Sequence, residues 1–246
     1  LGELSRQPEL ILEGLHCHIG SQIFEQDSFA KAADVMLDYV AELVAAGIAL
    51  TALNLGGGFG VRYVEGDEPV SPGDFLPGML AHLKAGLAER GLAPLKILIE
   101  PGRAIAANAG VTLYTVGGTK QTYGGKNYVF VDGSMADHIR TALYGASYEA
   151  ALAGRLDEAP DAVWTVTGKA CESGDILVRD IPLPQAGSGD ILAVFTTGAY
   201  HYSMASNYNR LPRPAVVFVR NGQSRLTVRR ETYEDLIRND VEEAYS

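Results

Sequence analysis

The sequence predicts an α/β unit followed by an all-β domain. Up to about residue 105, short apolar strands alternate with amphipathic helices, whereas beyond it short strands follow one another between Gly-, Pro- and Asn-containing turns. The first pattern is typical of parallel strands joined by crossover helices, and the second is typical of a β-sandwich or β-barrel. We therefore predict two domains, residues 1–105 and residues 106–246.

In the first domain, each expected helix carries apolar residues at helical spacing and stops at a glycine, Gly47 or Gly91. The short apolar runs between them are expected to be strands. The predicted strands are residues 15–19, 52–55 and 96–99, and the predicted helices are residues 28–46 and 75–88.

In the second domain, turn signals such as Asn221-Gly222 separate runs rich in β-branched and aromatic residues. A short helix is expected over residues 232–238. The predicted strands are residues 111–116, 127–131, 163–167, 176–178, 190–195, 215–219 and 225–228.

Charge and composition exclude several classes of function. The chain has 20 basic and 30 acidic residues, a net charge of −10, which argues against binding to nucleic acid or to an anionic membrane surface. No apolar run approaches the roughly 20 residues that span a bilayer. The two cysteines, Cys17 and Cys171, are far apart, so we expect a reduced cytoplasmic protein without a disulfide framework.

Polar or glycine-rich segments follow each predicted strand of the first domain. His16-Cys17-His18-Ile19-Gly20-Ser21 covers most of the first one and the two residues beyond its end. On a strand, His16 and His18 point the same way. They are core histidines or, less often, a metal-binding pair, although no further ligand is evident. Gly20 and Ser21 offer a backbone amide and a hydroxyl to an anion.

The second strand runs into Gly56-Gly57-Gly58-Phe59-Gly60, where the backbone can approach a ligand or simply pack closely. This run is neither a Walker loop nor a complete dinucleotide-binding motif. The third strand ends at Glu100-Pro101-Gly102-Arg103. A carboxylate at the tip of an apolar strand needs a cation. Glu100 therefore forms an ion pair with Arg103, or it faces a cofactor cation while Arg103 holds an anion.

The second domain contains two further candidate segments. Cys171-Glu172-Ser173-Gly174-Asp175 lies between predicted strands, and residues 198–209 form an aromatic and amide-rich stretch typical of an interface or a pocket wall. Arg140 and Tyr144 are four residues apart, so they share a face if this segment is helical.

Taken in order, these segments closely resemble the diaminopimelate decarboxylase family, which consists of fold-type III pyridoxal phosphate enzymes with a (β/α)8 barrel and a C-terminal β domain. The resemblance implies that the chain is the C-terminal part of such a barrel followed by the β domain. The matching runs are residues 14–22, 55–60, 100–103, 171–175, 198–200 and 207–209.

The resemblance implies a cofactor-binding role for residues at each strand end. His18 would stack on the pyridine ring of pyridoxal phosphate and act in catalysis, and Glu100 would pair with the ring nitrogen. The other implied cofactor-binding residues are Ser21, Gly56, Gly57, Gly58, Pro101, Gly102, Arg103 and Tyr200.

The family also implies how substrate is bound. The distal end of the zwitterionic substrate needs both an acidic and a basic partner, and a set of Glu and Arg residues supplies both. The implied substrate-binding residues are Arg103, Arg140, Tyr144, Glu172 and Tyr200. Cys171 would be the catalytic proton donor after CO2 leaves. With Glu172 it would reach into the partner's site, which implies a homodimer with shared active sites.

The expected reaction is decarboxylation of meso-2,6-diaminopimelate to L-lysine, the last step of lysine biosynthesis. One alternative is a sister decarboxylase of ornithine, arginine or carboxynorspermidine, although ornithine decarboxylases bind a plain distal amine with acidic residues. The other is a non-catalytic relative that binds a partner protein.

The family's catalytic lysine, which bonds to the cofactor aldehyde, is expected near the first barrel strands. No lysine of this chain stands in that context, about three of eight strand–helix units are present, and the chain begins with Leu1 rather than Met. The sequence therefore leads us to expect a chain that lacks the N-terminal barrel segment and folds poorly alone, because its sheet has open edges.

A labelling experiment tests this expectation. The chain is mixed with pyridoxal phosphate and reduced with borohydride, and covalent labelling is followed by absorbance and peptide mass. We expect no stably labelled lysine, because the lysine that bonds to the cofactor lies outside this sequence. A labelled lysine together with decarboxylase turnover would contradict it.

Overall fold

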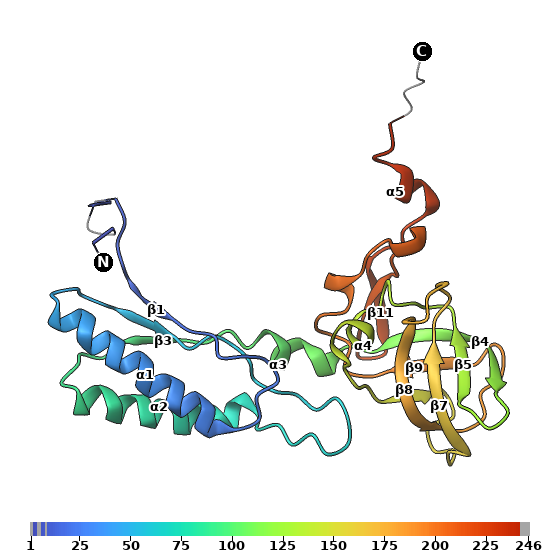
Figure 1. Cartoon of the computed structure of the whole chain (residues 1–246), viewed down its shortest axis with the longest axis horizontal. Helices are drawn as coiled ribbons and strands as arrows, with labels where there is room; N and C mark the ends of the chain where they lie inside the picture. Colours follow the sequence, from blue (N-terminus) through green and yellow to red (C-terminus); the bar gives the residue numbers. More distant parts are fainter. Residues whose placement is uncertain (1, 4–5, 8, 242–246) are drawn as a thin grey trace. The chain divides into compact units, whose positions relative to one another are not determined.

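The computed structural model describes residues 2, 3, 6, 7 and 9–241. Two compact units divide between Ala106 and Ala107 (Figure 1). No helix in the part of the chain that the structure describes is long and apolar enough to cross a membrane.

The first unit is a three-stranded parallel sheet in the order β1-β2-β3, as the strand–helix alternation predicts. Leu15 lies beside Leu53, and Leu53 lies beside Ile97, so all three strands end at the same edge. The elements are β1 (Gly14–His16), α1 (Gln26–Ala45), β2 (Ala52–Asn54), α2 (Pro72–Glu89), β3 (Lys96–Leu98) and α3 (Gly102–Ala106).

Helix α2 begins three residues earlier than its apolar pattern predicts, because its start is set by capping. The Ser71 hydroxyl accepts a hydrogen bond from the Asp74 amide at 3.2 Å. Pro72 occupies the first turn, where its missing N–H costs nothing. Helix α1 ends as expected next to Gly47, which has a φ of 84°.

The core of the first unit is built around three phenylalanines. Phe29 of α1 stacks on Phe59 at 5.0 Å, and Phe75 of α2 meets both rings edge-on at 5.0 and 5.4 Å. Pairs of this kind stabilise by about 0.5–1.5 kcal/mol each beyond the burial of their area. Because Phe59 directly follows the Gly56–Gly58 turn, this cluster fixes that turn against both helices.

The second unit is largely β, as predicted. A six-stranded sheet has the order β6-β9-β4-β5-β7-β8, and β10 and β11 form a separate hairpin. The elements are β4 (Thr112–Gln121), β5 (Asn127–Val131), α4 (Arg140–Tyr144), β6 (Ala150–Leu152), β7 (Ala162–Thr167), β8 (Ile176–Leu183), β9 (Ile191–Val194), β10 (Val216–Arg220), β11 (Gln223–Val228) and α5 (Tyr233–Ile237), with 3-10 turns at Ala107–Ala109, Tyr202–Met204 and Tyr208–Arg210.

The six-stranded sheet curls toward a barrel. Strand β4 pairs with β9 through its first half and with β5 through its second half, with a register shift between Val116 and Gly118. Bulges of this kind bend a strand. The end strands β6 and β8 also approach one another. Trp164, Leu177 and Leu192 are fully buried inside.

Three features of the second unit differ from the sequence prediction. Strand β4 continues five residues past its predicted end at Val116. Strand β6 was not predicted, because it is three residues long and begins with two alanines, which have weak β-propensity. Strand β8 continues five residues past its predicted end at Val178. Asp180 and Pro182 signal a turn in the sequence, but β8 lies at the end of the sheet, where a proline is tolerated.

Candidate functional site

Glu100 lies where the strands of the first unit end. The amide of Asn54, the last residue of β2, donates to its carboxylate at 2.8 Å, and the imidazole Nε2 of His16, the last residue of β1, lies 3.4 Å from the same oxygen. The Glu100 side chain is 54% exposed. The strand ends therefore hold an accessible carboxylate in a fixed position.

Arg103 is a buried cation, 7% exposed, on α3. Its guanidinium donates to the Ser21 hydroxyl at 2.8 Å and to the Tyr63 hydroxyl. Burying a charge without such hydrogen bonds is costly. Glu100 and Arg103 are thus held by different partners, and the ion pair that the sequence left open is not formed.

The Gly56–Gly58 turn passes in direct contact with the other two strand ends. A Cβ atom at Gly57 would overlap the carbonyl oxygen of Glu100, and one at Gly56 or Gly58 would overlap that of Cys17 or Gly20. Gly56 and Gly58 also have positive φ values of 69° and 98°. Close backbone packing by itself therefore requires glycine here.

Two amides of this turn already have partners. The Gly56 N–H donates to the Asn54 side chain at 2.9 Å, and the Gly57 N–H donates to Nδ1 of His18 at 3.1 Å. The sequence suggested that the backbone of this turn approaches a ligand or packs closely, and these two amides hold the turn to its neighbours. Because His18 Nδ1 is an acceptor, the neutral ring carries its proton on Nε2.

The histidine pair differs from its prediction. Strand β1 ends at His16 rather than continuing to residue 19, so His18 lies in the following loop, and the two rings contact different groups, Glu100 and Gly57. The strand alternation that predicted a common direction for the two rings therefore applies only as far as His16. Within the described residues, no group of three or more His, Cys, Asp and Glu side chains is placed to hold a metal ion.

In the second unit, Arg140 is held between two tyrosine rings. Its guanidinium carbon lies 5.3 Å from the ring centre of Tyr144, which shares helix α4, and 5.4 Å from that of Tyr200. Its Nε donates to the Tyr148 hydroxyl at 2.9 Å. A guanidinium fixed in this way is preorganised to bind a carboxylate through its planar fork.

Cys171 and Glu172 lie on an exposed loop that two other side chains hold. The Tyr208 hydroxyl donates to Glu172 at 2.9 Å, and this carboxylate raises the Tyr208 pKa. Buried Asp175 accepts from the backbone amides of Ala170 at 2.7 Å and Met135 at 2.5 Å. Asp175 thereby ties the loop to the segment that leads into α4. The Cys171 thiol is free.

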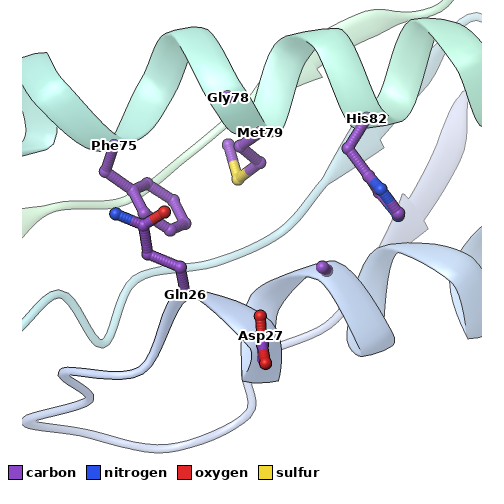
Figure 2. A pocket seen from close by; sticks show the side chains of 7 residues that line it. Gln26, Asp27, Phe75, Gly78, Met79 and His82 are labelled. Atoms are coloured by element: carbon purple, nitrogen blue, oxygen red, sulfur yellow. The ribbon is translucent and has the colours of Figure 1, made fainter.

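A surface pocket lies between α1 and α2 (Figure 2). Phe75 and Met79 form its apolar side, and Gln26, Asp27 and His82 line its edge. None of the predicted site residues lines it, so it does not bear on the chemistry.

Residues 1–107 match the model of the family described as "Pyridoxal-dependent decarboxylase, pyridoxal binding domain". Curated relatives extend the match over almost the whole sequence. The chain is 51% identical to the diaminopimelate decarboxylase of Halalkalibacterium halodurans over 94% of this chain and 53% of that protein. It is 49% identical to that of Bacillus subtilis over 98% of this chain and 56% of that protein.

Over nearly its whole length the chain is thus similar to diaminopimelate decarboxylases. It spans about half the length of the curated relatives it matches. Solved structures agree: a diaminopimelate decarboxylase from M. jannaschii in complex with L-lysine matches with a TM-score of 0.85 at 33% identity, over 93% of this chain and 52% of that one. The Helicobacter pylori enzyme with L-lysine matches with a TM-score of 0.83 at 32% identity, over 95% and 56%.

Several residues that hold the candidate site were not found from the sequence. Asn54 gives no signal except its place at a strand end, and Tyr148 looks like an ordinary core tyrosine. Tyr208 lies in a run that the family resemblance includes, but only the structure shows its contact with Glu172. Each of them acts through a partner distant in the sequence, so no local pattern identifies it.

The close contact at Gly57 leads to a stability prediction. Gly57→Ala should reduce the free energy of unfolding by about 3 kcal/mol, because the added methyl group overlaps the Glu100 carbonyl. Gly78→Ala in α2 is the matched control: nothing lies within 4 Å of its new Cβ, so it should add about 0.5–1 kcal/mol. Urea denaturation measures both. Equal effects of the two changes would be evidence against the tight contact.

Asp137 leads to a prediction about pH. Burial raises the pKa of its carboxyl to about 6, so the folded state binds this proton more tightly than the unfolded state. The contribution of Asp137 to the free energy of unfolding should therefore fall as pH rises from about 4 to about 6. Asp137→Asn should remove this contribution, so the variant should gain stability relative to the unchanged chain over this range, by up to ~2 kcal/mol at pH 7. Denaturation at several pH values measures it.

Exposed Asp157 provides the control for this pH dependence. Asp157→Asn should leave the slope between pH 4 and pH 6 as it is in the unchanged chain. An identical pH dependence in Asp157→Asn and in Asp137→Asn would show that Asp137 does not contribute to it.

Proposed function

We propose that this chain is the C-terminal part of a pyridoxal phosphate-dependent enzyme that decarboxylates meso-2,6-diaminopimelate to L-lysine and CO2. The observation that carries the proposal is Arg140, a guanidinium fixed between two tyrosine rings as a receptor for a carboxylate. The names of the relatives support it, as do the L-lysine complexes of the solved ones.

The finer architecture follows from the same proposal. Residues 1–105 would be the C-terminal part of a (β/α)8 barrel, and residues 106–246 would be the C-terminal β domain. The parallel β1-β2-β3 sheet supports this, because its polar residues gather at the carboxyl ends of the strands, where β/α barrels place their active sites.

The donors in the first unit fit pyridoxal phosphate. An accessible carboxylate at Glu100 suits the protonated ring nitrogen, and the Ser21 hydroxyl together with the Arg103 cation suits the phosphate. His18 would lie against the ring, held by its hydrogen bond to Gly57. The backbones of Gly56–Gly58 and Pro101–Gly102 and the Tyr200 side chain would complete the binding site.

When bound, the cofactor supplies a sink for the electron pair that remains as the C–C bond to CO2 breaks. The protein residues orient the substrate for that step. Arg140 would bind the distal carboxylate, together with Arg103, Tyr144 and Tyr200, and Glu172 would bind the distal ammonium. Cys171 would deliver a proton from its thiol to the carbon that loses CO2.

Cys171 and Glu172 are exposed on their loop, which supports their use at an interface. We propose that they complete the active site of a second copy, so that the enzyme works as a homodimer. Both cysteines are free thiols, which supports a reducing compartment such as the cytoplasm.

Substrates that differ at the distal end separate this function from its alternatives. Purified protein that contains this chain and the cofactor is assayed for CO2 release from meso-diaminopimelate, ornithine, arginine and carboxynorspermidine. We expect release from diaminopimelate, because Arg140 recognises the second carboxylate that ornithine and arginine lack. Preferential release from ornithine or arginine would establish the sister activity, and no release would favour a binding role.

Arg140→Ala should lower kcat/KM for diaminopimelate about 100-fold, because losing a charged partner of a buried carboxylate costs about 2–5 kcal/mol. Arg220→Ala, which removes an exposed cation on β10, is the matched control and should leave kcat/KM within about twofold of the unchanged enzyme, since exposed charges contribute little. Steady-state CO2 release measures both. Equal losses in the two variants would rule out a specific role for Arg140.

A further inference from the structure

Three aromatic rings are buried beside Arg140. His138, Tyr148 and His201 are 0%, 1% and 6% exposed. The His138 ring meets Tyr148 edge-on at 4.7 Å and His201 at 4.3 Å, and Tyr148 meets His201 at 5.3 Å. We call these three residues the ring cluster.

The two histidines of the ring cluster are hydrogen-bonded to each other. Nε2 of His201 lies 2.8 Å from Nδ1 of His138, so one nitrogen donates and the other accepts. Burial lowers the pKa of both side chains, and the neighbouring Arg140 cation lowers it further. At neutral pH the pair is therefore uncharged, and its single shared proton fixes the relative orientation of the rings.

The ring cluster holds two of the residues that were assigned to the substrate's distal end, Arg140 and Tyr200. His138 precedes Arg140 by two residues, and His201 directly follows Tyr200. Tyr148 touches both histidines and accepts the hydrogen bond from Arg140 Nε. The His138–His201 hydrogen bond thus joins two segments about sixty residues apart at the point where Arg140 meets the Tyr200 ring.

The backbone of Tyr200 needs such an anchor. Its φ of 60° lies in the left-handed region, which is unfavourable for a residue with a bulky side chain. Conformations of this kind cost about 1–3 kcal/mol and persist only where the surroundings enforce them. The next residue, His201, is buried and hydrogen-bonded, so it holds the chain in this conformation.

We propose that the His138–His201 pair is a positioning device that sets Arg140 and Tyr200 to receive a substrate carboxylate. This inference rests on the proposed function, in which the two residues bind the distal end of diaminopimelate. Neither histidine touches the substrate, and both act through the residues beside them. Loss of the hydrogen bond should therefore weaken recognition of a carboxylate more than it slows the chemical step.

Inhibition by the product, L-lysine, distinguishes a positioning role of the histidine pair from a general effect on stability. L-lysine keeps the distal carboxylate after decarboxylation, whereas cadaverine has no carboxylate. In the cofactor-loaded enzyme, His138→Leu and His201→Leu should each raise KM for diaminopimelate and the inhibition constant of L-lysine about tenfold. The inhibition constant of cadaverine and kcat should change less than about threefold. A merely structural role would shift both inhibitors alike, and that result would overturn the proposal.

Two conservative variants test whether restoring the hydrogen bond also restores recognition of the carboxylate. In His138→Asn the side-chain amide lies near the position of Nδ1, and in His201→Gln it reaches the position of Nε2, so each can restore the hydrogen bond. Both should return KM and the L-lysine constant to within about threefold of the unchanged enzyme. His82→Leu in α2 removes a histidine hydrogen bond elsewhere, to Asp34, and should alter neither value.

A measurement on the unchanged protein covers the case in which the leucine variants do not fold. Nitrogen-15 NMR of the imidazoles should show two neutral histidines at pH 7, whose signals shift with L-lysine but not with cadaverine. Signals insensitive to L-lysine would overturn the positioning role. An unchanged enzyme that releases no CO2 from diaminopimelate would instead contradict the proposed function, and the NMR comparison would still test the pair.

Discussion

The site of the first unit depends on the close approach of three backbone segments at the Gly56–Gly58 turn. The turn crosses the ends of the neighbouring strands so closely that a side chain at any of the three glycines would overlap a carbonyl oxygen. On one side it binds His18, and on the other its Gly56 carbonyl accepts from the Glu100 amide at 2.8 Å. Phe59 then anchors the turn in the aromatic core, so packing and site geometry depend on each other.

In the second unit, the proposed binding of an anionic group depends on how the Arg140 cation is held. Arg140 is half-buried, and tyrosine faces flank it while a tyrosine hydroxyl fixes its Nε. Ring faces stabilise a guanidinium without competing for all of its donors. The neutral histidine pair behind it supplies rigidity without adding a second charge. A preorganised receptor of this kind reduces the entropy lost on binding.

Local sequence signals predicted most of the regular structure. Strand β5 has its predicted bounds, and α1 and α5 lie within about two residues of theirs, because apolar spacing and capping residues act locally. The errors have tertiary causes. Strand β8 runs through Pro182 because it lies at the end of its sheet, and β1 stops at His16 because the Gly56–Gly58 turn occupies the space beyond it.

The sequence by itself determined the order of an α/β unit and a β unit, the glycine turn, and the family to which the decarboxylase motifs belong. These follow from residue types at fixed spacing. Only the tertiary structure decided the partners: Glu100 with Asn54 and His16, Arg103 with Ser21 and Tyr63, and His138 with His201. The physical reason is that hydrogen bonds and ring contacts between distant segments depend on how strands and loops meet, which no local pattern records.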